Sequence, residues 1–256
     1  MKMSVTGHLE ELRWRIIRSV IYVLAASIVA LVFADNILYI LKLPSKGLID
    51  SFLILKPAES IAIYMKTAIF SGLAIAALPV FWEFFGFVKP AAFQAPLPAD
   101  SNGQNLSAAK WVITAFLLFV LGILFVYFIV LPAAIAFLMN LSQGLTGGMP
   151  AQITLTSYVS FVCALLFCGG MIFQIPLMAF ILTKIGMITP GLLSSKRKEA
   201  YFSLVVLAAV ITPTTDAFSL GLFVLPMIAL YEVGVLFSKA VYKSQIVKGG
   251  EVYEQR

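Results

Sequence analysis

The sequence has few charged residues for its length. Aspartate, glutamate, lysine and arginine together make up 12% of its 256 residues, whereas 61% are hydrophobic. A soluble globular protein carries roughly a quarter of its residues as charges, so a chain with half that proportion cannot cover a surface that faces water. This shortage excludes a soluble fold and indicates an integral membrane protein.

Cysteine and histidine are also scarce. Cys163 and Cys168 are five residues apart in an apolar segment, a spacing typical of neither a disulfide framework nor a metal site, so we interpret both as small packing residues. The single histidine, His8, has no nucleophile in a recognisable motif, and the HExxH, GxSxG and phosphate-loop signatures are absent. All aspartates lie in predicted loops. We therefore expect no enzyme, no metal site and no cofactor.

Long apolar runs, in contrast, recur along the chain. A helix needs about 20 apolar residues to cross a bilayer, and mean hydropathy here is +1.00. Proline interrupts the third and fourth runs, at Pro132 and Pro176, and the fifth run is too short to cross a membrane of ordinary thickness unless the bilayer thins or the last two runs form a re-entrant pair. We predict an all-α integral membrane protein with six transmembrane helices, the fifth and sixth short, over residues 16–33, 61–87, 111–138, 158–182, 201–211 and 218–237.

The net charge of +6 is explained by membrane topology rather than by nucleic-acid binding. With a cytoplasmic N-terminus, most of the 18 basic residues fall in cytoplasmic segments, including Lys196, Arg197 and Lys198. This bias predicts that both termini are cytoplasmic. The exceptions lie in or near the first external loop and are Lys42, Lys46, Lys56 and Lys66. We expect a membrane domain over residues 1–240 and a cytoplasmic polar tail over 241–256.

Three polar residues lie within or at the ends of the expected spans. Glu83 and Glu232 are near predicted cytoplasmic ends, and Gln174 precedes Pro176 in the middle of the fourth span. Ionisable groups in a bilayer cost roughly 2.5 to 3.5 kcal/mol and are functional candidates. One interpretation is a polar path through a small-molecule or ion transporter. The other is that the carboxylates reach the headgroups and Gln174 hydrogen-bonds a neighbouring helix. The absence of an internal repeat weakens the transporter interpretation.

Several short motifs occur in a fixed order along the chain. They are HLEELRWR before the first span, PVFWEFFGFVKPAAF at the end of the second, FQIP in the fourth, ITP and KRK before the fifth, TPTTDAFS after it, and LPMIALYEVGVLFSK at the close. Together they resemble the TatC family, the multispanning receptor subunit of the twin-arginine protein translocase. The resemblance implies a six-helix membrane bundle that binds signal peptides bearing two consecutive arginines and helps to export folded proteins with energy from the proton gradient.

The resemblance also implies a cytoplasmic surface for the signal peptide. Glu11 matches the family glutamate implicated in recognition, and a carboxylate pairs well with a planar guanidinium. Arg13 and Arg15 match arginines that fix the surrounding surface, and Phe87 and Pro90 match an FxxP motif. The alternative, that this stretch only starts and anchors a helix, does not exclude recognition.

The first cytoplasmic loop departs from the family pattern. The family usually has a PALYxxE run whose glutamate is the main partner of the twin arginines, whereas this chain reads KPAAFQAPLPADSNGQNLSAAKW and places Gln104 near that position. Glutamine cannot form an ion pair. Either Asp100, the only acid in the loop, substitutes for it, or the chain is a divergent member that no longer selects twin-arginine signals.

The resemblance further implies partners and a location. The partners are twin-arginine signal peptides, single-span proteins of the TatA and TatB type, further copies of this chain in a homo-oligomer, and the lipid bilayer, with no nucleic acid. The location is the bacterial cytoplasmic (inner) membrane. The residues expected to contact partners or to form polar contacts within the membrane are Pro44, Glu59, Gln174, Asp216 and Glu232.

Overall fold

The computed structural model describes the backbone of residues 5–49, 51–92, 101–145, 153–184, 186–211 and 217–254. Side chains are described for residues 10–49, 51–87, 109–144, 153–184, 186–210 and 220–242. The chain divides into two compact units, Met1–Phe87 with Asn102–Gly170, and Val88–Ser101 with Met171–Arg256. Each unit is described by itself.

The described chain is almost entirely helical, as expected from its composition. The elements are α1 (Val5–Val32), α2 (Ala34–Lys42), the 3₁₀ turn η1 (Leu43–Ser45), β1 (Phe52–Leu53), α3 (Pro57–Ile75), α4 (Ala77–Ala92), α5 (Ser101–Phe125), the π-helical segment η2 (Val126–Val130), α6 (Leu131–Leu145), β2 (Ile153–Thr154), α7 (Leu155–Ile172), α8 (Ile175–Lys184), α9 (Pro190–Ser195), α10 (Arg197–Ile211) and α11 (Ala217–Glu254).

Five stretches of the described helices are long and apolar enough to cross a membrane: Glu10–Val32, Pro57–Ile75, Ala109–Gly144, Leu155–Lys184 and Leu220–Tyr242. These match the first four predicted spans and the sixth. The predicted fifth span corresponds to α10, which is 15 residues long. The all-α, multi-pass fold class is therefore confirmed. The last helix is longer than its apolar run, because α11 continues to Glu254, past the boundary predicted at residue 240.

The prolines account for the interruptions within the spans. A proline lacks the amide hydrogen of a helical bond, and its ring clashes with the carbonyl four residues earlier. The π-helical segment η2 ends two residues before Pro132, and the turn between α7 and α8 lies just before Pro176. The second predicted span is also divided, at Ala76, three residues before Pro79. The second, third and fourth apolar runs are therefore each two helices joined by a local change in hydrogen bonding.

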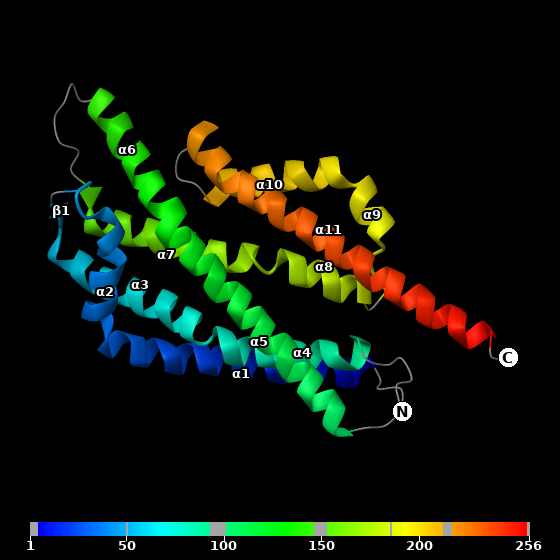
Figure 1. The fold of residues 1–256 in the computed structure, drawn as a ribbon. Coiled ribbons are helices and arrows are strands. Elements are labelled where there is room, and N and C mark those ends of the chain that lie inside the picture. The colour runs from blue at the N-terminus through cyan, green and yellow to red at the C-terminus, as the bar shows by residue number, and fades with distance from the viewer. Residues whose placement is uncertain are drawn as a thin grey trace. The chain divides into compact units, whose positions relative to one another are not determined.

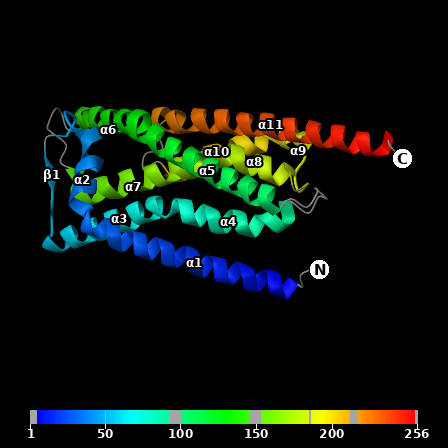
Figure 2. The same ribbon diagram turned by 60° about the horizontal axis from the view of Figure 1, so that its bottom comes forward.

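Small residues let the helices of the first unit approach closely. Helix α1 runs beside α3 (Figures 1 and 2), and a side chain at Gly72 would overlap the backbone of Ser27. A Cβ at Gly122 of α5 would lie 2.5 Å from the carbonyl oxygen of Gly169 in α7. Close approach at glycine is a usual means of packing helices in lipid, where van der Waals contact supplies much of the attraction.

The end of the first unit that carries the sheet is held by tyrosine hydroxyls. Tyr127 donates to the carbonyl of Ile40 and Tyr158 to that of Leu41, both at 2.8 Å. These bonds tie the C-terminal end of α2 to η2 and to α7. Strands β1 and β2 pair in parallel immediately before α3 and α7, so the two helices start at the same end and run in the same direction (Figure 1).

The second unit is built on α8 and α11, which lie side by side (Figure 1). A Cβ at Gly234 would lie 3.2 Å from the Cα of Pro176. Nearby, the hydroxyls of Thr183 and Ser238 are 2.6 Å apart and buried. The hydroxyl of Tyr231 donates to the carbonyl of Leu193 at 2.8 Å and ties α9 to α11.

Candidate functional site

The HLEELRWR motif lies within α1 and brings Arg15 between two carboxylates. Arg15 Nε and Nη2 donate to Oε1 of Glu11, one turn earlier, at 3.0 and 2.7 Å. Its Nη1 donates to Oε2 of Glu83 in α4 at 3.1 Å and to the carbonyl oxygen of Glu83 at 3.3 Å. One guanidinium therefore joins the first helix to the end of the second predicted span.

The burial of this cluster differs from one carboxylate to the other. The side chain of Glu83 is 8% exposed, and it also lies 3.8 Å from Nη1 of Arg18. A buried carboxylate is stable only when it is paired and hydrogen-bonded, and the two arginines meet that need. The side chain of Glu11 is 25% exposed. Both bonds from Arg15 end on Glu11 Oε1, and no described residue bonds to its Oε2.

Gly86 makes room for the guanidinium. A Cβ at this position would overlap Nη1 of Arg15. Any larger residue at position 86 would therefore push Arg15 away from Glu83. The glycine of the PVFWEFFGF motif thus has a role in the ion-pair cluster that its sequence context did not reveal.

The remaining residues predicted for the signal-peptide surface are less well placed. Arg13 is exposed, and Phe87 is half-buried at the edge of the first unit. Pro90 lies in α4 and Gln104 in α5, but their side chains are outside the described set. Asp100 lies outside the described residues altogether. The structure thus brings together Glu11 and Arg15, and adds Glu83 and Arg18, which the motif comparison did not assign to this surface.

Two of the residues predicted to contact partners lie at the sheet end of the first unit. Pro44 is in η1. Glu59 is in the first turn of α3, where its Oε2 accepts a bond from the amide of Leu55 at 3.2 Å and one from the hydroxyl of Thr156 at 3.4 Å. Glu59 therefore ties the start of α3 to the start of α7.

The other predicted contact residues belong to the second unit. Gln174 is buried, 7% exposed, in the turn before α8, and Asp216 lies outside the described residues. Glu232 of α11 accepts a 2.7 Å bond from Arg197 Nη2 and a 2.5 Å bond from the hydroxyl of Tyr201. Arg197 was interpreted only as a topology anchor, yet its side chain joins α10 to α11.

These pairings bear on the transporter interpretation. Glu83 belongs to the first unit, and Gln174 and Glu232 to the second. Each carboxylate is bound to an arginine of its own unit, Glu83 to Arg15 and Glu232 to Arg197. Neither acid is therefore available as a free charge for a transported ion. No local spacing in the sequence could have found these pairs, because the partners are 68 and 35 positions apart.

Comparison with known proteins agrees with this architecture. The family model described as Sec-independent protein translocase protein (TatC) matches residues 7–226. The TatC protein of Aquifex aeolicus is 34% identical over 239 residues, covering 93% of this chain and 95% of its own. The TatC protein of Carboxydothermus hydrogenoformans is 31% identical, with 93% and 94% covered. The chloroplastic TATC of Arabidopsis thaliana is 30% identical and matches over 67% of its length.

A solved structure gives the same result in three dimensions. The crystal structure of the twin arginine translocase receptor TatC superimposes with a TM-score of 0.78 and 32% identity, covering 92% of this chain and 99% of that one. The fold and the relatives define a multi-pass helical membrane protein of the protein-translocation class. The chain belongs to the TatC family.

Proposed function

We propose that this chain is the receptor and core subunit of a twin-arginine translocase in the bacterial cytoplasmic membrane. It binds twin-arginine signal peptides and helps to export folded proteins with energy from the proton gradient, without catalysing a reaction. Family membership and the similarity to a solved receptor support this function. The single observation that carries the recognition step is the geometry of Glu11.

Glu11 can accept a second guanidinium without losing its first. Arg15 occupies only Oε1, while Oε2 has no partner among the described residues and the side chain is partly exposed. A bond between a guanidinium and a carboxylate is charge-assisted and stronger than a neutral hydrogen bond. In the proposed complex, one signal-peptide arginine donates to Oε2 of Glu11.

Glu83 keeps Arg15 in place while this happens. If Glu11 turns toward the incoming arginine, Arg15 still donates to the side chain and the carbonyl of Glu83. Arg15 therefore keeps a partner when the peptide binds. The complex does not carry the desolvation cost of a buried, unpaired guanidinium. Arg15 therefore acts as a positioning residue for Glu11, and Glu83 holds Arg15.

The second signal-peptide arginine needs its own acceptor. Gln104 carries no charge, so we assign this role to Asp100, the acid of the same loop, with Phe87 and Pro90 as the apolar edge and Arg13 at the rim. In the divergent alternative, in which this chain no longer selects twin-arginine signals, Asp100 would have no effect on peptide binding.

The proposal includes the wider assembly. Both termini face the cytoplasm, single-span partners of the TatA and TatB type bind the chain, and several copies form a homo-oligomer. The positions proposed for these contacts are Pro44, Glu59, Gln174, Asp216 and Glu232. Glu59 and Glu232 also hold helices together within their own units, so partners would meet the surfaces that these residues shape.

Site-specific photocrosslinking in membrane vesicles tests the receptor function. Photoreactive residues at Leu12, Phe87 and Gln104 would be exposed to a twin-arginine signal peptide and to the same peptide with both arginines replaced by lysine. We expect crosslinks with the arginine peptide that fall sharply with the lysine peptide and in the Glu11→Gln and Asp100→Asn backgrounds. Glu10→Gln, a neighbouring exposed acid, is the matched control and should retain them. Equal crosslinking by both peptides would overturn twin-arginine recognition.

A further inference from the structure

Lys66 is a cation inside a membrane-spanning helix, and no acidic side chain among those that the structure describes pairs with it. It lies in α3, within the candidate span Pro57–Ile75, and is half-buried. Its Nζ donates to the hydroxyl of Ser160 in α7 at 2.7 Å, and that hydroxyl donates onward to the carbonyl of Thr156. None of the ion pairs among the described residues includes Lys66. Ionisable groups within a membrane span usually pair with one another or with backbone carbonyls, so the charge of Lys66 calls for an anion.

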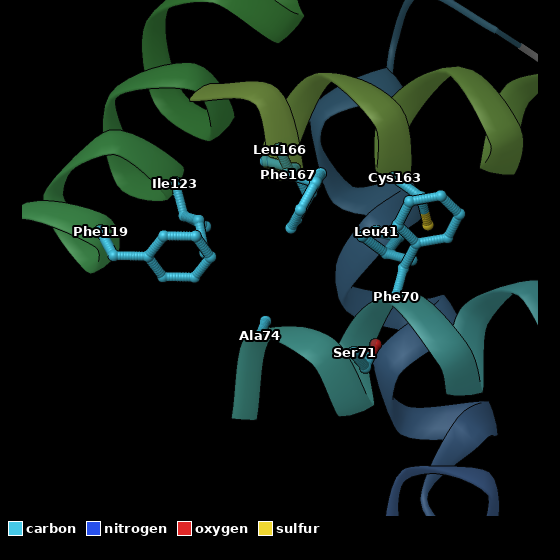
Figure 3. Close-up of a pocket in the computed structure, with 9 residues that line it drawn as sticks. All are labelled: Leu41, Phe70, Ser71, Ala74, Phe119, Ile123, Cys163, Leu166 and Phe167. Atoms are coloured by element: carbon cyan, nitrogen blue, oxygen red, sulfur yellow. The ribbon is translucent and has the colours of Figure 1, made fainter. Parts of the chain in front are cut away.

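A small apolar cleft of about 80 Å³ lies in the same unit, between α3, α5 and α7, with α2 at its edge. Phe119 and Ile123 point into the space from α5, and Phe167 points into it from α7, opposite Ala74 of α3 (Figure 3). Only Ser71 and Cys163 contribute polarisable or polar atoms to the lining. The lining therefore suits a hydrocarbon chain.

Lys66 lies one helical turn before Phe70, and its partner Ser160 lies three residues before Cys163; Phe70 and Cys163 both line the cleft. Residues four apart on a helix share a face, so Lys66, Phe70 and Ala74 form one stripe on α3. Ser160, Cys163 and Phe167 form the facing stripe on α7. Since α3 and α7 run in the same direction from the β1–β2 pair, the bond between Lys66 and Ser160 lies on the side of the cleft that is nearer the sheet. The ammonium is therefore on the sheet side of the cleft, and the apolar lining continues along α3 and α7 away from the sheet.

We propose that this cleft binds an acyl chain of an anionic phospholipid whose headgroup phosphate pairs with Lys66. Lys66 is about 7.5 Å of helix rise inside the start of the span expected at residue 61. A lysine side chain reaches from such a depth to the headgroup level. The headgroup phosphate supplies an anion for Lys66, and the acyl chain fills the apolar cleft. The site does not depend on twin-arginine recognition.

Native mass spectrometry of the purified full-length protein tests the proposal. The protein would be extracted from vesicles that contain equal amounts of dioleoyl-phosphatidylglycerol and dioleoyl-phosphatidylcholine. These lipids have the same acyl chains but different net charge. We expect phosphatidylglycerol to be retained about fivefold over phosphatidylcholine, the preference that one lysine confers. Lys66→Gln should reduce the ratio to about one, and Lys66→Arg should preserve it.

A second variant tests the chain-binding part separately. Ala74→Phe fills the cleft and should remove both lipids, although Lys66 is intact. Lys42→Gln, a lysine of α2 in the same unit, is the control and should leave retention unchanged. Equal retention of the two lipids by the unaltered protein, a preserved preference in Lys66→Gln, or full retention in Ala74→Phe would each overturn the site. Thermal unfolding in detergent checks that the variants are folded.

Discussion

Arg15 and Glu83 form an ion pair, 3.1 Å between Nη1 and Oε2, across 68 positions of sequence. The pair joins the first helix of the membrane bundle to the end of the second span. Because Arg15 also binds Glu11, the same guanidinium links the internal packing of the first unit to the carboxylate proposed to receive the signal peptide.

Replacing Glu11 with glutamine should weaken the binding of a twin-arginine signal peptide about 10- to 100-fold, the range expected for losing one charged hydrogen bond. The free energy of unfolding should change little, because Arg15 retains Glu83. Fluorescence polarisation with a labelled peptide measures the affinity. Glu10→Gln should bind as the unaltered protein does. Equal loss in both variants would mean that general surface charge, and not Glu11, attracts the peptide.

Glu83→Gln should destabilise the protein by about 1 to 3 kcal/mol, because it leaves a buried amide facing two arginines. It should also weaken peptide binding, since Arg15 then depends on Glu11 alone. Thermal unfolding and the same binding assay measure the two effects. The matched control is Glu199→Gln, which removes an exposed ion pair with Lys196 and should alter neither. Unchanged stability in Glu83→Gln would show that the buried pair is not needed for packing.

Gly86→Ala should act through Arg15. The added methyl overlaps the Arg15 guanidinium, so Arg15 must shift relative to Glu83, and we expect both the unfolding midpoint and peptide affinity to fall. At Gly221 in α11, an added methyl meets nothing within 4 Å in the part of the chain that the structure describes. Gly221→Ala should therefore be neutral or slightly stabilising, as alanine is favoured over glycine in a helix. The prediction fails if the two variants behave alike in thermal unfolding.

Thr67→Val should stabilise the protein. Thr67 is fully buried and its hydroxyl has no hydrogen-bond partner in the described part of the chain, so a methyl of the same shape removes an unmet desolvation cost. We expect the unfolding midpoint to rise by about 2 to 4 °C. Thr183→Val should lower it, because that hydroxyl binds Ser238 and the carbonyl of Ala179. A fall of the midpoint in Thr67→Val would point to a bound water at that hydroxyl.

Much of the fold follows from local sequence. Apolar length predicted the spans, and Pro132 and Pro176 marked where their helices are interrupted, because the missing amide and the ring clash act on the residues directly before them. The ordered motifs led to the TatC family. The break at Ala76 was not expected, because the run from 61 to 87 was read as one span from its hydropathy, and hydropathy does not report the hydrogen bonding of the backbone.

The candidate site was only partly predictable. Glu11 and Arg15 came from one motif, whose spacing of four places both side chains on one face of a helix. Glu83 was recognisable as a polar residue at the end of a span. The sequence was equally consistent with a functional carboxylate and with a side chain that simply reaches the lipid headgroups. The choice between these explanations depended on how α4 packs against α1. The spacing of residues within either helix gives no information about that packing.

By itself, the sequence determined that this protein is a helical membrane protein of the TatC family. Composition and the length of the apolar runs indicated the membrane helices, because each residue in a span must suit the bilayer, and the ordered motifs indicated the family. Only the tertiary structure decided which charges meet: Arg15 with Glu83, Arg197 with Glu232, and Lys66 with Ser160 rather than with an acid. Those pairings depend on the distance between helices. The distance is short where glycine lets two backbones approach, and longer where a side chain fills the space between them.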